Sequence, residues 1–226
     1  MTLMRKIKML FRSDIKFYAR RGVMLKRLIE IILEKSFDLH DTPDIQLASG
    51  KFSNFYIDCK PTTLDPEGKY LIANLIFDKI SDIGINAIGG LSTGADPISD
   101  AVSLFSFFEK KPIKAFYVRK EIKDHGTKKK IEGDVQKGSR VVIVDDVITT
   151  GSSTIQAIES ARQEGLEVVK VIVLVDREEG GRAEILKLVS DFESIVTKQS
   201  LMEVFNARYR KKRTASRQPL ATYQTM

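Results

Sequence analysis

The sequence has very little cysteine and no long run of apolar residues. Cys59 is the only cysteine among 226 residues, so neither a disulfide framework within the chain nor a zinc site built on several cysteines is possible. No apolar segment approaches the roughly 20 residues that a transmembrane helix requires. A single cysteine fits a reducing compartment, so we expect a cytoplasmic protein without a membrane segment.

Several common ligand-binding motifs are also missing. The chain has neither the GxxxxGK[ST] pattern of P-loop nucleotide-binding proteins nor the GxGxxG pattern of dinucleotide-binding proteins. Its His, Cys, Asp and Glu residues show no spacing typical of a metal held by protein ligands alone. The sequence therefore predicts no metal site of that kind.

Positive charge is concentrated at the two ends of the chain. The net charge is +7, yet residues 1–22 carry +6 and residues 208–226 carry +6, which leaves 23–207 at −5. We expect a flexible basic extension at 1–22, one folded domain at 23–207, and a disordered basic tail at 208–226. The acidic domain disfavours a nucleic-acid partner, and none is expected.

Apolar periodicity predicts strands alternating with helices. Helices are expected at 23–39, 65–84 and 151–164, two short strands at 45–60, a strand, a turn and a helix at 85–108, strands at 113–120 and 140–145, a loop at 121–139, a strand running into a turn at 168–181, and a helix with a last strand at 182–197. Such alternation is typical of an α/β fold with a mainly parallel sheet covered by helices on both faces. Ligands bind such sheets beyond the carboxyl ends of the strands.

One of the turns at a strand end, TTGSS, has the composition of a phosphate-binding loop. Gly151 permits backbone angles that other residues resist, and the following helix directs its unpaired N–H groups at the same place. Hydroxyl donors come from Thr149, Thr150, Ser152 and Ser153. Taken alone, the loop is equally typical of an ordinary helix cap.

Two adjacent acids, Asp145 and Asp146, immediately precede this loop. They would repel a phosphate unless another group lies between. A ribose 5-phosphate satisfies both features, because its hydroxyls donate to the carboxylates while its phosphate occupies the loop. The carboxylates would also stabilise positive charge that develops on the sugar ring.

The run VVIVDDVITTGSS resembles the phosphoribosyl-diphosphate (PRPP) binding motif of the type I phosphoribosyltransferases. With YVRKEIKDHG (117–126), VDREEGG (175–181) and LASGKFSNFYID (47–58), the chain is most similar to the orotate phosphoribosyltransferase family. The resemblance implies a type I phosphoribosyltransferase fold with a small hood from the N-terminal region. It also implies transfer of ribose 5-phosphate from PRPP to orotate. The implied PRPP-binding segment is Asp145, Asp146, Val147, Ile148, Thr149, Thr150, Gly151, Ser152 and Ser153.

The charged stretch RKEIKDHG carries four groups suited to a diphosphate leaving group: Arg119, Lys120, Lys123 and His125. Lys and Arg neutralise such a group and His can protonate it. A solvated loop is the ordinary interpretation of so many charges. The resemblance implies that all four bind PRPP, that Lys123 and His125 act in catalysis with the two acids, and that the loop is shared across a homodimer.

Orotate, a planar anion, calls for a cation and a stacking surface. Arg177 offers the cation, and Phe55 and Tyr56 offer the surface. The alternative is a surface pair of Arg177 with Glu178 or Glu179 and a core phenylalanine. The resemblance favours an orotate site that also includes Thr149, and it implies Mg²⁺ carried on the diphosphate.

The chain departs from this family at Ala48, Gly94 and Ala95, where some members have lysine nearby. Two other interpretations stay open. One is a phosphoribosyltransferase for a purine base, and the other is a PRPP-sensing regulator that binds nucleic acid through its basic ends.

Overall fold

The computed structural model describes residues 21–39, 42, 45–46, 52–53, 55–121 and 130–215. The predicted N-terminal extension therefore lies outside the described residues, apart from positions 21 and 22. The loop residues Lys123 and His125 also lie outside them.

A six-stranded sheet forms the centre of the molecule, with strand order β10-β9-β8-β5-β6-β7. All neighbouring strands are parallel except β6 and β7, which are antiparallel. The strands are β5 (Ala87–Leu91), β6 (Lys114–Val118), β7 (Ile131–Glu132), β8 (Arg140–Ile148), β9 (Glu167–Asp176) and β10 (Phe192–Thr197). The predicted α/β fold with a mainly parallel sheet is confirmed.

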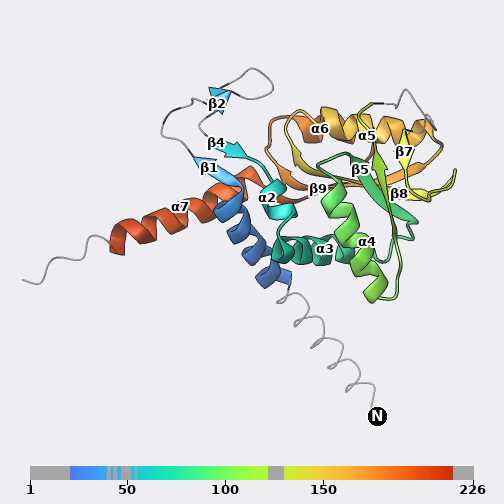
Figure 1. Ribbon diagram of the computed structural model, residues 1–226. Helices are drawn as coiled ribbons and strands as arrows, with labels where there is room; N and C mark the ends of the chain where they lie inside the picture. The colour runs from blue at the N-terminus through green and yellow to red at the C-terminus, as the bar shows by residue number, and fades with distance from the viewer. Residues whose placement is uncertain are drawn as a thin grey trace, which may run out of the picture.

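Helices cover both faces of this sheet (Figure 1). On one face lie α3 (Pro66–Ile80) and α4 (Asp96–Phe108), and on the other lie α5 (Ser152–Gln163) and α6 (Gly181–Leu186). Along β8, Val142 and Val144 enter the core beneath α3, whereas Val141 and Ile143 enter the core beneath α5. A strand with two buried faces needs a continuous branched apolar run, which is what the sequence supplies there.

The chain before α3 forms a small structure outside the main sheet (Figure 1). Residues 21–35 are helical, β1 (Phe37–Leu39) pairs antiparallel with β4 (Phe55–Ile57), β2 (Ile45–Gln46) pairs antiparallel with β3 (Phe52–Ser53), and α2 spans Lys60–Thr63. The two strands predicted for 45–60 are confirmed, and β4 follows them. The helix predicted for 23–39 was too long, because its last residues pair with β4 instead.

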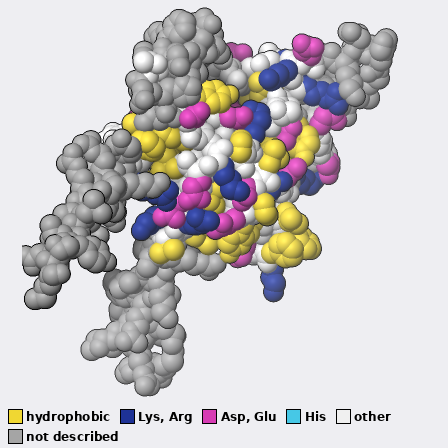
Figure 2. Space-filling view, turned by 60° about the vertical axis from the view of Figure 1, so that its left-hand side comes forward, with side chains coloured by type: hydrophobic (Ala, Val, Ile, Leu, Met, Phe, Trp, Pro, Cys, Tyr) yellow, Lys and Arg dark blue, Asp and Glu magenta, His cyan; other side chains and the backbone are white. Residues whose placement is uncertain are grey.

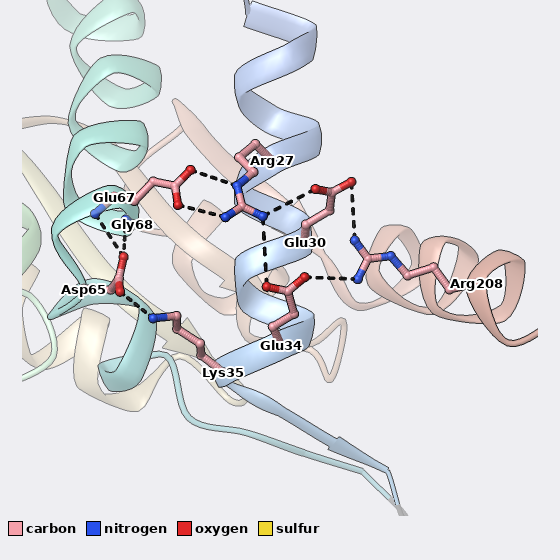
Figure 3. A network of polar contacts seen from close by, with 8 residues as sticks. All are labelled: Arg27, Glu30, Glu34, Lys35, Asp65, Glu67, Gly68 and Arg208. Atoms are coloured by element: carbon pink, nitrogen blue, oxygen red, sulfur yellow. Dashed lines mark hydrogen bonds and ion pairs between the residues drawn. The ribbon is translucent and has the colours of Figure 1, made fainter. Parts of the chain in front are cut away.

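The C-terminal helix α7 (Lys198–Ala215) is a correction to the expected disordered tail. Its backbone stays helical through residues 208–215, in the segment that was expected to lack structure. Arg208 forms ion pairs with Glu30 (3.3 Å) and Glu34 (3.6 Å) of the N-terminal helix (Figure 3). Leu201, Val204 and Phe205 have the i, i+3, i+4 spacing of an amphipathic helix, and Leu201 and Val204 pack in the core. This pattern is short and runs into a basic segment, and the prediction did not take it up.

Two other boundaries differ from the prediction. Strand β8 runs to Ile148 rather than ending at 145, because its pairing with β9 continues to the Ile148–Asp176 pair. The predicted loop at 121–139 contains β7, which pairs with the end of β6. Within the part of the chain that the structure describes, no helix combines the length and apolar character needed to cross a membrane.

Candidate active site

The paired acids lie inside the last part of β8, at the centre of the sheet. Asp145 is 5% exposed and Asp146 is 9% exposed. The Asp145 carboxylate accepts hydrogen bonds from the Thr154 hydroxyl (2.7 Å) and from the backbone N–H of Asp146 (3.0 Å). The Asp146 carboxylate accepts from the backbone N–H of Val147 (3.0 Å). No cationic side chain in the described ranges forms an ion pair with either acid.

This environment makes the ionised form of Asp145 costly. Burial, and then the neighbouring Asp146 carboxylate, raise the pKa of Asp145 to about 7. Asp146 interacts electrostatically with Lys60 of α2, which raises the pKa of that lysine, but neither acid is in an ion pair with a described cation. A buried pair of carboxyl groups without an ion-pair partner is unfavourable for the fold itself. Such groups are typical of functional sites, where a ligand supplies the missing donors or positive charge.

Gly94, in the turn after β5, packs directly against the acid pair. A Cβ atom at this position would lie 2.4 Å from Oδ1 of Asp146 and 3.3 Å from Oδ1 of Asp145. Glycine is therefore required there by the close approach to the carboxylates. In this turn some family members have a lysine, whereas this chain has Gly94. The structure gives a reason for the difference, because the turn here leaves no room for a side chain beside the acids.

The phosphate-loop candidate has the geometry of an open helix N-terminus. Gly151 precedes α5 with φ +83° and gives the helix no side-chain cap. The side chains of Thr150, Ser152 and Ser153 are exposed, while Thr149 is partly buried. Uncapped first-turn N–H groups and free hydroxyls at one place can hold a phosphate.

Two residues predicted to bind PRPP can contribute only through their backbones. The Ile148 side chain belongs to the core beneath α5, and Val147 packs against the opposite core. Their side chains therefore anchor the end of β8 rather than face a ligand.

The loop after β8 and the turn after β9 are joined by backbone hydrogen bonds. The Gly181 N–H donates to the Thr149 carbonyl (2.9 Å), and the Arg177 N–H donates to the Ile148 carbonyl (3.1 Å). A Cβ atom on Gly181 would lie 2.7 Å from the Thr149 oxygen. These contacts fix the predicted orotate residues Thr149 and Arg177 beside the phosphate loop.

The structure brings Arg177 and Phe55 together. The guanidinium carbon of Arg177 lies 4.8 Å from the centroid of the Phe55 ring, and both residues are 5% exposed. Arg177 also pairs with Glu179, at 3.1 Å from Nε and 3.0 Å from Nη2. The alternative interpretation is confirmed in that Arg177 pairs with Glu179 and Phe55 belongs to the core, although Arg177 is buried rather than at the surface. The orotate-binding role of Arg177 stays a prediction.

Tyr56 is not part of this cluster. Side chains alternate along a strand, and in β4 the residues Phe55 and Ile57 are buried while Tyr56 is 48% exposed. Its side chain points to the opposite side of β4 from the ring of Phe55.

Three residues near the site were not predicted from the sequence. Thr154 holds Asp145, Phe37 stacks on Phe55 with a ring separation of 6.5 Å, and the Lys198 ammonium lies 4.2 Å from the Phe55 centroid. Thr154 could have been found from its place in the first turn of the helix after the acids. Phe37 and Lys198 carry no local signal, since they reach Phe55 from a separate strand and from an unpredicted helix.

The cations that begin the charged loop are placed beside α5. The Lys120 carbonyl accepts a hydrogen bond from the Gln156 side chain of α5 (3.3 Å). Arg119 forms a short ion pair with Glu132 of β7. Lys120 is thus adjacent to the phosphate-loop helix through its backbone, and Arg119 carries a carboxylate partner that a ligand would have to replace.

No group of three or more His, Cys, Asp or Glu side chains that could hold a metal occurs in the described residues. Two buried carboxylates alone suit a cation that keeps most of its water ligands and takes its other ligands from a phosphate group. The donor set of Asp145 and Asp146 thus fits Mg²⁺ carried by a diphosphate.

Residues 65–210 match the family model described as phosphoribosyl transferase domain. Orotate phosphoribosyltransferase from Aquifex aeolicus is 46% identical over 167 residues, which cover 73% of this chain and 91% of that protein.

Solved structures show the same relation. Mycobacterium tuberculosis H37Rv orotate phosphoribosyltransferase in complex with Fe(III) dicitrate is 32% identical with a TM-score of 0.68, covering 79% of this chain and 98% of that one. The structure of the same enzyme in complex with PRPP is 26% identical with a TM-score of 0.61, covering 80% and 90%.

Proposed function

The chain belongs to the phosphoribosyltransferase family, and from this premise we propose that it transfers the 5-phosphoribosyl group of PRPP to orotate. The products are orotidine 5′-phosphate and diphosphate, and the reaction is a step of pyrimidine biosynthesis. The observation that carries the proposal is the buried, uncompensated acid pair Asp145–Asp146 beside the uncapped phosphate loop. The relatives' names support orotate as the acceptor.

The acid pair and the phosphate loop bind different parts of the ribose 5-phosphate. The 5′-phosphate binds the N–H groups and hydroxyls of residues 149–153, and the ribose hydroxyls donate to Asp145 and Asp146. As the bond from the ribose carbon to diphosphate breaks, positive charge develops on the sugar ring. The two carboxylates stabilise that charge, and their burial strengthens the effect.

The charged loop is proposed to bind the leaving diphosphate. Arg119 and Lys120 start this loop beside α5, and Lys123 and His125 follow them in sequence. We assign to Lys123 and His125 the neutralisation and protonation of the departing group. Asp145 and Asp146 are the residues that would hold a Mg²⁺ ion on the diphosphate, through its water ligands, and such an ion would neutralise part of the diphosphate charge.

Orotate lies against the cluster formed by Arg177 and Phe55. A guanidinium pairs with a carboxylate through two hydrogen bonds, so the orotate carboxylate would compete with Glu179 for Arg177. Phe55 is buried beneath Arg177 and Lys198 and supports these cations rather than stacking on the base. Thr149 adds a polar group between base and phosphate loop. Tyr56 is exposed on the opposite side of β4 from Phe55, so it would contact orotate only if the base also reached that side.

A homodimer that shares the charged loop is also proposed. Its support is the exposed apolar surface near the end of α4, which includes Leu104, Phe107 and Phe108 at 62–69% exposure. Hydrophobic side chains stand out at the lower right of the face in Figure 2. Contiguous exposed apolar surface is typical of protein interfaces. The cytoplasmic location expected from the single cysteine stays a prediction.

The direct test mixes the purified chain with orotate, PRPP and Mg²⁺ and follows the loss of orotate absorbance. Turnover that requires all three components supports the proposal. Absence of turnover with orotate, together with turnover of a purine base, would replace it with the purine alternative. Salt-sensitive binding of RNA or DNA without any turnover would favour the regulatory alternative.

A further inference from the structure

Lys198 and Arg177 occupy equivalent positions at the ends of neighbouring parallel strands. In the register of β10 and β9, Thr197 pairs with Asp176, so Lys198 and Arg177 are the next residues on each strand. Both therefore lie at the carboxyl edge of the sheet, which is the edge where ligands bind in folds of this kind. The part of the site that is proposed to hold the orotate base is thus bordered by two cations, Arg177 and Lys198, rather than by Arg177 alone.

Both cations contact the same aromatic ring. The Lys198 ammonium lies 4.2 Å from the Phe55 centroid, and the Arg177 guanidinium carbon lies 4.8 Å from it. Arg177 is paired with Glu179. Lys198, by contrast, forms no ion pair with any acid of the described ranges. The positive charge of Lys198 is therefore not taken up by an ion pair with a described acid, although the Glu178 carboxylate lies close in the chain, where it accepts from the Gln199 N–H. A charge without an ion-pair partner favours an anionic ligand.

The backbone that carries Lys198 is anchored to the turn that carries Arg177. The Gln199 N–H donates to the Glu178 carboxylate (2.8 Å), which ties the start of α7 to the residue after Arg177. The Thr197 hydroxyl accepts from the Ser200 N–H (3.1 Å), and the Ser200 hydroxyl donates to the Thr197 carbonyl (2.8 Å). Lys198 is therefore held at a fixed place beside Arg177, and only its partly buried side chain has to reach the ligand.

We propose that Lys198 is a base-binding residue that, together with Arg177, recognises the carboxylate of orotate and so selects a carboxylated pyrimidine over an uncharged one. This inference rests on the proposed function, because it assigns a role within the same site. An ammonium group over an aromatic ring is partly desolvated, so an arriving carboxylate interacts with it more strongly than in water. The Phe55 ring also limits where the Lys198 ammonium can lie, so the ammonium can approach the orotate carboxylate from one direction.

The test compares two nucleotides that differ only in the base carboxylate, orotidine 5′-phosphate and uridine 5′-phosphate. Calorimetry measures the dissociation constant of each for the wild-type chain, Lys198→Met and Lys198→Arg. Methionine keeps the length and the contact with Phe55 but removes the charge. Lys187→Met is the matched control, because Lys187 is exposed and, among the described residues, pairs with Glu184 alone, at the end of α6. Thermal unfolding of each variant and steady-state kinetics with orotate and PRPP complete the set.

We expect Lys198→Met to weaken orotidine 5′-phosphate binding about 10-fold or more, as for the loss of a hydrogen bond to a charged group. Binding of uridine 5′-phosphate should change less than about 2-fold. The KM for orotate should rise by a similar factor while kcat and the KM for PRPP stay near wild type, and arginine should restore part of the loss.

An unchanged ratio of the two dissociation constants in Lys198→Met would overturn the proposal, as would an equal loss for both nucleotides together with lowered thermal stability. If the wild-type chain turns over orotate and the ratio is unchanged, Lys198 is excluded and the proposed function stands. If the wild-type chain does not turn over orotate, the proposed function fails, and the two dissociation constants still decide whether Lys198 reads the carboxylate.

Discussion

Acidic side chains cluster in two regions of the molecule, and the two regions differ in whether these acids form ion pairs. On the surface, Arg27 binds both oxygens of Glu67 at 2.8 Å and also faces Glu30 and Glu34, which Arg208 approaches from α7 (Figure 3). Every acid in this network has a cation beside it. Dark blue and magenta side chains also intermingle across the middle of the face in Figure 2.

In β8, by contrast, Asp145 and Asp146 lie side by side in the interior with hydrogen bonds but no ion pair to a described cation, although the charge of Lys60 acts on Asp146. Compensated acids at the surface join three helices and are screened by water. Uncompensated acids in the interior raise one another's energy, so their presence is explained by a ligand rather than by the fold. The difference separates charges that support the structure from charges that carry chemistry, and each prediction below tests it.

The largest effect is expected from neutralising the interior acids. Asp146→Asn or Asp145→Asn should lower kcat about 100-fold or more, because each removes a carboxylate positioned for charge that develops in the transition state. The orotate absorbance assay measures this loss. Glu67→Gln, which neutralises a surface acid, is the control and should keep wild-type kcat. A similar loss in both kinds of variant would remove the distinction between the two regions.

A steric change next to the acids should have the next largest effect. Gly94→Ala places a methyl group 2.4 Å from the Asp146 carboxylate, so the carboxylate must move. We expect kcat/KM for PRPP to fall about 10-fold or more, because small displacements of positioned groups are costly in catalysis. Gly22→Ala is the control, since nothing lies within 4 Å of its added Cβ, and it should leave the kinetics unchanged. Wild-type kinetics in Gly94→Ala would show that the turn does not fix the acids.

The interior pair should also give the fold a characteristic pH dependence. With the pKa of Asp145 raised to about 7, the folded chain holds a proton between about pH 4 and 7 that the unfolded chain has released. Stability from this group is therefore present at low pH and is lost as pH rises through about 7. Asparagine at 145 should remove this loss and stabilise the chain at pH 8 by on the order of 2 kcal/mol relative to wild type.

Denaturant unfolding of wild type and Asp145→Asn at several pH values measures this difference. Parallel stability curves for the two proteins between pH 4 and 8 would mean that the carboxyl is not perturbed by burial.

The smallest effect is expected from the surface network. Arg27→Ala should lower the melting temperature slightly at low salt. In 1 M NaCl the difference in melting temperature between the variant and wild type should become smaller, because salt screens the exposed charges. Catalysis should not change. Thermal unfolding at two salt concentrations measures this effect. A large loss that is independent of salt would mean that Arg27 stabilises the helices through packing instead.

The alternation of strands and helices was predictable because each element has its own local pattern. The branched run before Asp145 and the small residues of 149–153 lie within one short segment, so their combination could be recognised without knowing the fold. The predicted boundaries were less accurate than the order of the elements. The acids proved to lie within β8 because pairing with β9 extends that strand. Helix α7 was missed although Leu201, Val204 and Phe205 have helical spacing, because the apolar stretch is short and its packing partners, such as Phe37, are remote in the chain.

The sequence by itself determined the order of the elements and the acid pair followed by a phosphate loop, since both are encoded in contiguous residues. Only the tertiary structure decided that Gly94 covers the acids and that Arg177 and Lys198 meet on Phe55. The physical reason is that these contacts depend on which strands are neighbours, and burial at the centre of the sheet is what changes the pKa of Asp145. Strand order and burial are properties of the assembled sheet, and no local pattern records them.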